Sequence, residues 1–291
     1  MNICGVFLLV MISNVSGFLN HVSIHRFNNK KILPLRKVVH EIDYISNVKE
    51  SLIINSFGYF LLNNTNQQSL TSSGLDNSFI LGLGLYSLLG FQGYSIAVVY
   101  FILGSLVTKV KKEKKEKLGI YEKREGKRGP ENVWGSAGVA MVCAIVSYLY
   151  KDNTYMNEII KIGYVSSFVT KLSDTFQSEL GKAYGKNTIL ITNFKKVPPG
   201  TEGAISIEGY IFGIIGSFIL SYFSFFIHFI NSGVEIIICM CAALIANTIE
   251  SYLGATIQNK NYIVLLTNEQ INFFNTLIGS LLAMVIYIIN T

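Results

Sequence analysis

Two polar stretches interrupt the apolar second half of the sequence and carry the side chains best suited to chemistry. The first holds Asp174 and Glu179 within the run KLSDTFQSELG, and the second is the run VPPGTEG at 197–203. A third carboxylate, Glu250, follows a later apolar segment. Carboxylates beside membrane segments are costly to place against lipid, so they indicate a site that faces protein or water and has a charge partner such as a metal.

Asp174, Glu179 and Glu250 are predicted to be catalytic and to bind Mg²⁺, which takes one or two carboxylates together with phosphate oxygens. Asp174 and Glu179 are five positions apart, about 140° around a regular helix. They can therefore share a site only if the helix ends or bulges near Gly181. The alternative is that Asp174 or Ser173 caps a helix.

The glycine-rich run is predicted to bind phosphate. Backbone N–H groups of Gly200, Thr201 and Gly203 could form an anion-binding turn, although similar turns occur in ordinary loops. Three polar side chains beside this turn complete the expected phosphate site: Lys195, Lys196 and Ser206. Phosphoryl transfer requires a metal, cations and correct positioning, all of which this set could supply. Neither a Walker-type nor a protein-kinase motif occurs, so a nucleotide site here is not of those kinds.

The composition indicates how these residues are held. Half of the 291 residues are hydrophobic and only 14% are charged, against about 25% in soluble domains. The fold class is predicted to be all-α, a polytopic helical membrane protein with about six or seven transmembrane or half-membrane helices. Residues 77–108 exceed one span and are predicted to form two helices broken near Gly90 and Gly93. Further helices are expected over 133–150, 159–172, 209–230, 236–248 and 271–289. The second and fourth of these are short for a full crossing and are expected to be shielded by protein.

The basic segment Lys109–Arg128 is expected to set the membrane topology. Its ten lysines and arginines outnumber its four glutamates by six, which equals the formal net charge of +6. The positive-inside bias places it on the cytosolic or stroma-like side, and a nucleic-acid partner is not expected. Counting crossings from this loop brings Asp174, the glycine-rich run and Glu250 to that same side.

The N-terminal region has the features of a targeting sequence. Residues 1–19 contain a short apolar run typical of a signal segment, and the following basic stretch is typical of a transit peptide. Residues 20–77 are predicted to be transit-like and poorly ordered, and 78–291 to form the helical membrane domain, with a basic loop at 109–130. This bipartite pattern favours a plastid-type organelle membrane. A signal anchor in another endomembrane is the alternative.

Several blocks, in order, resemble the integral membrane family that includes plant phytyl-phosphate kinase and animal transmembrane protein 19, known as the domain of unknown function 92 family. The blocks are 127–129 (KRG), 173–181 (SDTFQSELG), 197–203 (VPPGTEG), 250–258 (ESYLGATIQ) and 272–276 (NFFNT), and the resemblance covers about 78–291. Two departures are visible. Glu250 stands where the family more often has Asp, which could shift the metal geometry, and Lys171 and Ser173 replace small residues.

The resemblance implies a membrane kinase that transfers a phosphoryl group from CTP or another nucleoside triphosphate to an isoprenyl monophosphate, phytyl or polyprenyl, giving the diphosphate. The expected partners are this isoprenyl phosphate, the nucleotide and membrane lipid. Four further residues are expected to bind phosphates or orient the head group: Arg128, Gln258, Asn272 and Asn275. The alternatives are a transporter or ion-conducting protein that uses the same carboxylates, and a non-catalytic membrane scaffold.

Overall fold

The computed structural model describes residues 35–65, 69–258 and 267–291. The chain divides into the units Met1–Glu41 and Ile42–Thr291, and only the beginning of helix α2 is described in the first. The signal-like segment and most of the transit-like segment therefore lie outside the described residues. The elements in order are α2 (Leu35–Asn63), α3 (Ser72–Thr108), α4 (Lys112–Lys117), η1 (Lys123–Gly126), α5 (Pro130–Leu149), α6 (Thr154–Tyr184), β1 (Ile189–Leu190), β2 (Ala204–Ile205), α7 (Ile207–Phe226), α8 (Gly233–Leu253), η2 (Gly254–Gln258) and α9 (Asn268–Asn290).

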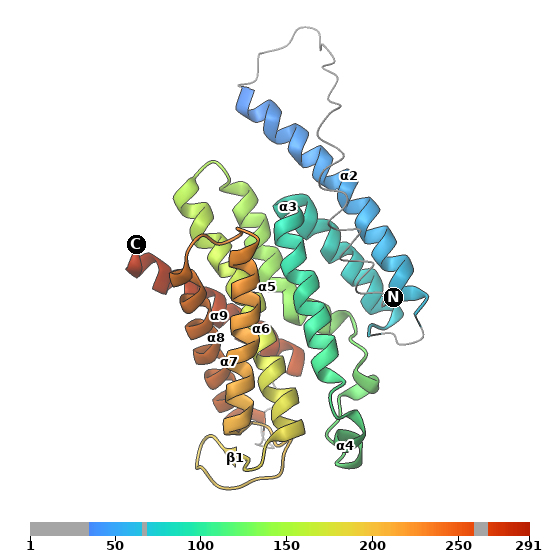
Figure 1. Ribbon diagram of the computed structural model, residues 1–291, viewed down its shortest axis with the longest axis vertical. Helices are drawn as coiled ribbons and strands as arrows, with labels where there is room; N and C mark the ends of the chain where they lie inside the picture. Colours follow the sequence, from blue (N-terminus) through green and yellow to red (C-terminus); the bar gives the residue numbers. More distant parts are fainter. Residues whose placement is uncertain (1–34, 66–68, 259–266) are drawn as a thin grey trace. The chain divides into compact units, whose positions relative to one another are not determined.

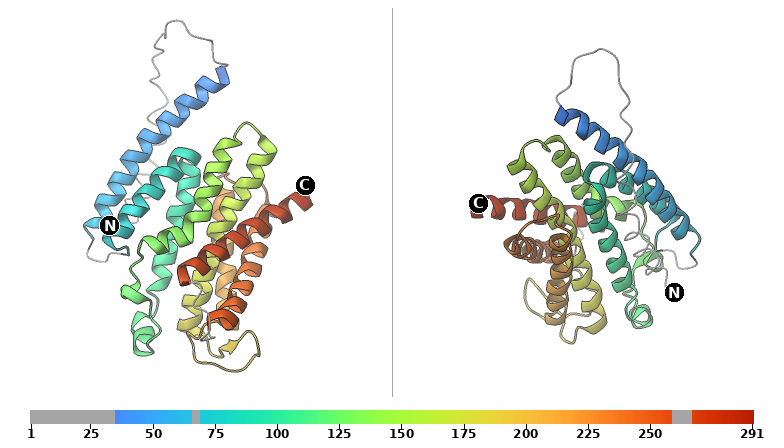
Figure 2. Two further views of the ribbon diagram at one scale, coloured as in Figure 1. Left: turned by 180° about the vertical axis from the view of Figure 1, so that it is seen from behind. Right: turned by 45° about the horizontal axis from the view of Figure 1, so that its top comes forward.

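The structure confirms the all-α membrane class. Helices α3, α5, α7 and α9, together with Gly233–Thr256, which comprises α8 and the start of η2, are long and apolar enough to cross a membrane. They lie beside one another and around α6 (Figures 1 and 2). Their outward faces carry exposed apolar side chains such as Ile211, Phe218 and Ile237. In a soluble protein such a surface would be a liability, but against lipid it is the expected one.

Helix α3 is broken where the sequence predicted. Gly90 has φ of 65° and ψ of −167°, so two helical halves meet at this residue. Glycine adopts this conformation without the steric cost that a Cβ would impose. The break is held in place by the Tyr164 hydroxyl, which donates a hydrogen bond of 2.7 Å to the Gly93 carbonyl. The preference for a broken pair over one tilted helix is confirmed.

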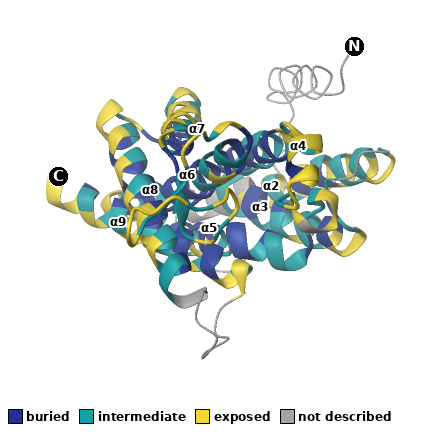
Figure 3. Cartoon of the chain, turned by 90° about the horizontal axis from the view of Figure 1, so that it is seen from below, coloured by how far each residue is buried: buried dark blue, intermediate teal, exposed yellow. Residues whose placement is uncertain are grey.

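Helix α6 is the centre of the bundle and is longer than the sequence suggested. It packs against α3, α5, α7, α8 and α9, and buried residues gather around it in Figure 3. Its 31 residues lie between the N-cap Asn153 and the C-cap Gly185, without a break at Gly181. The short helix expected over 159–172 is therefore corrected. Neighbouring helices bury the polar residues of α6, so the apolar run did not mark where the helix ends.

Two other boundaries differ from the predictions. Helix α8 covers 21 residues rather than the short segment 236–248, because it continues through Glu250. Residues 35–63, predicted to belong to a poorly ordered linker, form α2. This helix turns polar side chains toward α3: Ser51 donates to the Leu83 carbonyl, and Tyr59 donates to Asp76. Several of its apolar side chains, such as Ile53 and Phe60, are exposed, so the usual apolar inward stripe was absent from the sequence pattern.

The connecting segments gather at one end of the bundle. The basic loop with α4 and the antiparallel pair β1–β2 lie at the lower end in Figure 1. Helices α6 and α8 finish at this end, while α5, α7 and α9 begin there. The predicted convergence of the basic loop, the Asp174 region, the glycine-rich run and Glu250 is therefore present in the structure.

Candidate functional site

A cavity of about 450 Å³ lies where these segments meet. It is lined by residues of α3, the basic loop, α5, α6, the glycine-rich loop, α8 and α9. Its side chains include five cationic ones (Arg124, Lys127, Arg128, Lys171, Lys182) and five acidic ones (Glu122, Asp174, Glu202, Glu250, Glu269). Such a mixture suits a ligand that carries phosphates together with a cation.

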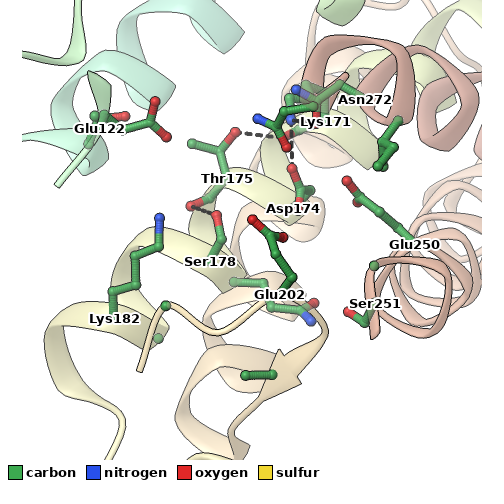
Figure 4. A pocket seen from close by; sticks show the side chains of 18 of the residues that line it. Glu122, Lys171, Asp174, Thr175, Ser178, Lys182, Glu202, Glu250, Ser251 and Asn272 are labelled. Atoms are coloured by element: carbon green, nitrogen blue, oxygen red, sulfur yellow. Dashed lines mark hydrogen bonds and ion pairs between the residues drawn. The ribbon is translucent and has the colours of Figure 1, made fainter. Parts of the chain in front are cut away.

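One face of α6 forms a wall of this cavity. Lys171, Asp174, Thr175, Ser178 and Lys182 all line it. Their spacing of three or four residues places them on one side of a regular helix. The sequence therefore aligns two lysines, a carboxylate and two hydroxyls along a single stripe, and Figure 4 shows the two lysines on opposite sides of Asp174.

Asp174 and Glu250 form the acidic centre of the cavity. Their carboxyl groups are within hydrogen-bonding reach of each other, and Glu202 adds a third negative charge close by (Figure 4). The Lys171 ammonium donates to Asp174 at 2.6 Å and to the Asn272 side-chain oxygen at 2.7 Å. One lysine cannot balance several carboxylates, so the cluster favours a further cation.

Amide side chains beneath the cavity fix the position of Glu250. Asn275 donates from its amide nitrogen to both Glu250 and the Asn247 side-chain oxygen, the latter at 3.0 Å. Asn247 in turn donates to Ser173 at 3.0 Å, and Ser173 donates to the Gly213 carbonyl. This buried chain joins α9, α8, α6 and α7, so it orients the carboxylate from three neighbouring helices.

Glu179 is not brought to Asp174 and Glu250. Its side chain is only 1% exposed and does not line the cavity. One of its oxygens accepts from Lys115 at 2.6 Å and the other from Lys182 at 2.9 Å. Because α6 continues as a regular helix, the 140° separation between Asp174 and Glu179 is kept. The arrangement of these three acids expected from the sequence is thus replaced by Asp174, Glu250 and Glu202.

The Lys115–Glu179 ion pair attaches the basic loop to α6, whereas the Lys182–Glu179 pair lies within α6. Lys115 is fully buried and also donates to the Thr108 carbonyl at 2.6 Å. Lys182 lies in the last turn of α6, beside the loops. Burial alone would lower the pKa of Lys182, but the charge of Glu179 and its hydrogen bond outweigh this effect, so the pKa is raised. The lysine therefore remains protonated in the folded protein at neutral pH.

The glycine-rich loop contributes to the cavity as predicted, although not through every expected residue. Gly200, Thr201, Gly203 and Ser206 line it. The Thr201 N–H is used within the turn and donates to the Pro198 carbonyl. The Ser206 hydroxyl caps α7 by accepting from the Gly209 N–H at 3.1 Å.

Both glycines of this loop have positive φ, 87° at Gly200 and 74° at Gly203. A Cβ on Gly203 would lie 2.6 Å from the Ser251 carbonyl oxygen. This close approach holds the loop against the end of α8. By contrast, Lys195 and Lys196 are exposed and lie outside the cavity lining, so their expected contact with phosphate has no support in this geometry.

The remaining predicted residues fall into three groups. Arg128 and Asn272 line the cavity, and Arg128 donates to the Tyr100 hydroxyl at 3.3 Å. Asn275 lies beneath the cavity and acts through Glu250. The side chain of Gln258 lies outside the described residues.

Sequence reasoning missed seven of the ten charged residues that line the cavity: Glu122, Arg124, Lys127, Lys171, Lys182, Glu202 and Glu269. A check for helical spacing from Asp174 would have found Lys171 and Lys182.

Magnesium is compatible with these residues. Within the described ranges, no three His, Cys, Asp or Glu side chains are arranged to hold an ion by themselves. Mg²⁺, however, usually takes only one or two carboxylates and completes its shell with water and phosphate oxygens. Asp174 and Glu250, adjacent and facing a polar cavity, supply such a donor pair.

Comparison with known proteins gives several relatives. The family described as integral membrane protein DUF92 matches residues 56–280. An uncharacterized membrane protein of Synechocystis sp. is 44% identical over 80% of this chain and 88% of its own length. Protein VTE6, chloroplastic, of Arabidopsis thaliana is 42% identical over 74% of this chain and 64% of its own. An uncharacterized membrane protein of Methanocaldococcus jannaschii is 33% identical over 75% of this chain and 86% of its own. No solved structure matches.

Proposed function

The chain belongs to the DUF92 family of integral membrane proteins, and we propose that it is a kinase that converts an isoprenyl monophosphate into the diphosphate. The donor is CTP or another nucleoside triphosphate, and the acceptor is a phytyl or polyprenyl phosphate. The observation that carries the proposal is the single cavity in which the Asp174–Glu250 pair meets several cations and a glycine-rich turn. These are the parts on which phosphoryl transfer depends.

The reaction needs little covalent help from the protein. A phosphate oxygen of the acceptor forms a bond to the terminal phosphorus of the donor, and the bond from that phosphorus to the bridging oxygen breaks. The nucleoside diphosphate leaves with those electrons. Because the acceptor oxygen is already anionic, no side chain has to remove a proton. This agrees with a cavity lining that contains no histidine among the described residues.

Each group in the cavity has a defined task in this proposal. Asp174 and Glu250 would hold Mg²⁺, which neutralises phosphate charge when it is bound. Lys171, Lys182 and Arg128 bind phosphate oxygens and stabilise the charge that spreads over the transferred group. Asn275 keeps Glu250 in position. The membrane helices provide an apolar environment for the isoprenoid tail.

The proposal also draws on the resemblance to a family that includes a plant phytyl-phosphate kinase. It draws as well on the 42% identity to a protein named as chloroplastic. We therefore propose a plastid-type membrane as the location. The rival function, that of a transporter or ion-conducting protein, would use the same carboxylates but would give the glycine-rich turn no role. A kinase would use both the carboxylates and the glycine-rich turn.

The test is an assay of the purified protein in liposomes with labelled CTP and phytyl or geranylgeranyl phosphate. The variants Asp174→Asn and Glu250→Gln should lose about 100-fold or more in rate, as expected when a group that stabilises transition-state charge is removed. Glu113→Gln is the matched control, since this acid is exposed on α4 outside the cavity. The proposal fails if the native protein forms no diphosphate from either acceptor with any nucleoside triphosphate.

A further inference from the structure

The two lysines on the α6 stripe stand at different levels of the cavity wall. Lys171 and Lys182 are separated by eleven residues, so their backbone positions lie about 16 Å apart along the helix. Both side chains are also tied locally, Lys171 to Asp174 and Lys182 to Glu179. Resting on the proposed function, we propose that the cavity has two phosphate subsites: an inner one for the isoprenyl phosphate and an outer one for the nucleoside triphosphate.

The inner subsite is built from helices. Lys171 contacts Asn272 of α9, and Tyr100 of α3 lies within electrostatic range of it. Tyr100 also accepts from Arg128, whose guanidinium lies 5.6 Å from the ring centre. Two cations and an amide thus converge between α3, α6 and α9. A phosphate held here lies within the bundle, where an attached isoprenoid tail remains at the level of the membrane helices.

The outer subsite is built from loops. Lys182 is 24% exposed, compared with 9% for Lys171, and it faces Glu122 of the basic loop. The cavity lining near the loops adds Lys127 and the turn Gly200–Gly203. A water-soluble nucleotide reaches this end of the cavity first. Its phosphate chain, when bound by Lys182, can extend along Thr175 and Ser178 toward Asp174.

Asp174 and Glu250 lie between the two subsites, where the phosphoryl group would be transferred. Asp174 is three residues from Lys171 and eight from Lys182, about 4.5 Å and 12 Å along the helix. The terminal phosphate of the nucleotide would therefore meet the acceptor beside Asp174 and Glu250. The longer arm accommodates the triphosphate, and the shorter arm accommodates a single phosphate. This asymmetry assigns the outer subsite to the nucleotide.

The experiment measures the two ligands separately in nanodiscs, using a non-hydrolysable CTP analogue and phytyl monophosphate. Lys182→Gln should weaken nucleotide binding about tenfold or more and change phytyl phosphate binding less than about twofold. Lys171→Gln should do the reverse. Lys117→Gln, an exposed α4 residue outside the cavity, is the charge-matched control. Arg128→Gln repeats the inner test, and Lys127→Gln the outer one, if either first variant fails to fold.

The outcomes separate the two proposals. If the native protein binds neither ligand, the kinase function itself is wrong. If it binds both, and each variant weakens both equally, the cavity has one shared phosphate site and the two-subsite proposal is overturned. A reversed pattern, with Lys182 governing phytyl phosphate, also overturns it. Selective losses in the expected directions support it.

Discussion

Replacing Glu179 by glutamine tests whether this residue holds the fold together or binds the metal. Glu179 and Lys115 are 1% and 0% exposed, and their atoms are 2.6 Å apart. Removing one partner of such a pair leaves a buried charge unbalanced, which costs about 3–5 kcal/mol. The introduced amide could still accept one hydrogen bond, so we expect a loss of about 3 kcal/mol, at the lower end of that range. This corresponds to a fall in Tm of roughly 6–12 °C for a domain of this size.

The assay is thermal unfolding of the purified protein in detergent, followed by the fluorescence of Trp134. Asp174→Asn is the matched comparison. Lys171 keeps its hydrogen bond to Asn272 in this variant, and the repulsion between Asp174 and Glu250 is relieved, so its Tm should stay within about 3 °C of the native value. The double variant Glu179→Gln with Lys115→Met should recover part of the loss, since it removes both charges. A native Tm for Glu179→Gln, together with weakened Mg²⁺ binding, would show that Glu179 is a metal ligand after all.

Three further perturbations follow from the geometry. Gly203→Ala should displace the glycine-rich loop and lower activity at least tenfold, because its Cβ would overlap that of Ala255 at a φ of 74°; kinetics with both substrates measure this. Asn275→Ala should lower kcat and leave the KM of either substrate nearly unchanged, because it releases Glu250 without touching a ligand. Equal rises in both KM values with unchanged kcat would contradict this role. Phe218→Asp should reduce the yield of membrane-inserted protein, because this outward side chain of α7 is 48% exposed on a helix apolar and long enough to cross the membrane; carbonate extraction measures the inserted fraction.

Much of the fold could be predicted because lipid imposes strong rules. Helices are required across the membrane, and a run of apolar residues marks them, as for α5, α7 and α9. The rule weakens where protein rather than lipid surrounds a helix. Helix α6 is enclosed by five others, so it carries Lys171 and Glu179 without any cost from lipid. The polar side of α2 faces α3, so its sequence lacks an apolar stripe and resembles that of a linker.

The candidate site was predictable in its segments but not in its side-chain pairs. The order of crossings brought Asp174, the glycine-rich run and Glu250 to one end of the bundle. Which carboxylates meet there depends on helix phase, and the assumed end of α6 near Gly181 placed Glu179 on the wrong face. The burial of Lys115 against Glu179 joins residues 64 positions apart and leaves no local signal. Lys195 was predicted to bind phosphate only because it precedes the glycine-rich run in the sequence, and in the structure its side chain is exposed outside the cavity.

The most direct measurement follows the terminal phosphate of the nucleotide in a single turnover by the purified protein. With labelled CTP and phytyl phosphate in liposomes, we expect the label to appear in the terminal phosphate of phytyl diphosphate, with one CDP formed for each. Asp174→Asn should slow this transfer about 100-fold or more while leaving the protein folded. Label released only as inorganic phosphate, or transfer at a near-native rate in Asp174→Asn, would contradict the proposed kinase function.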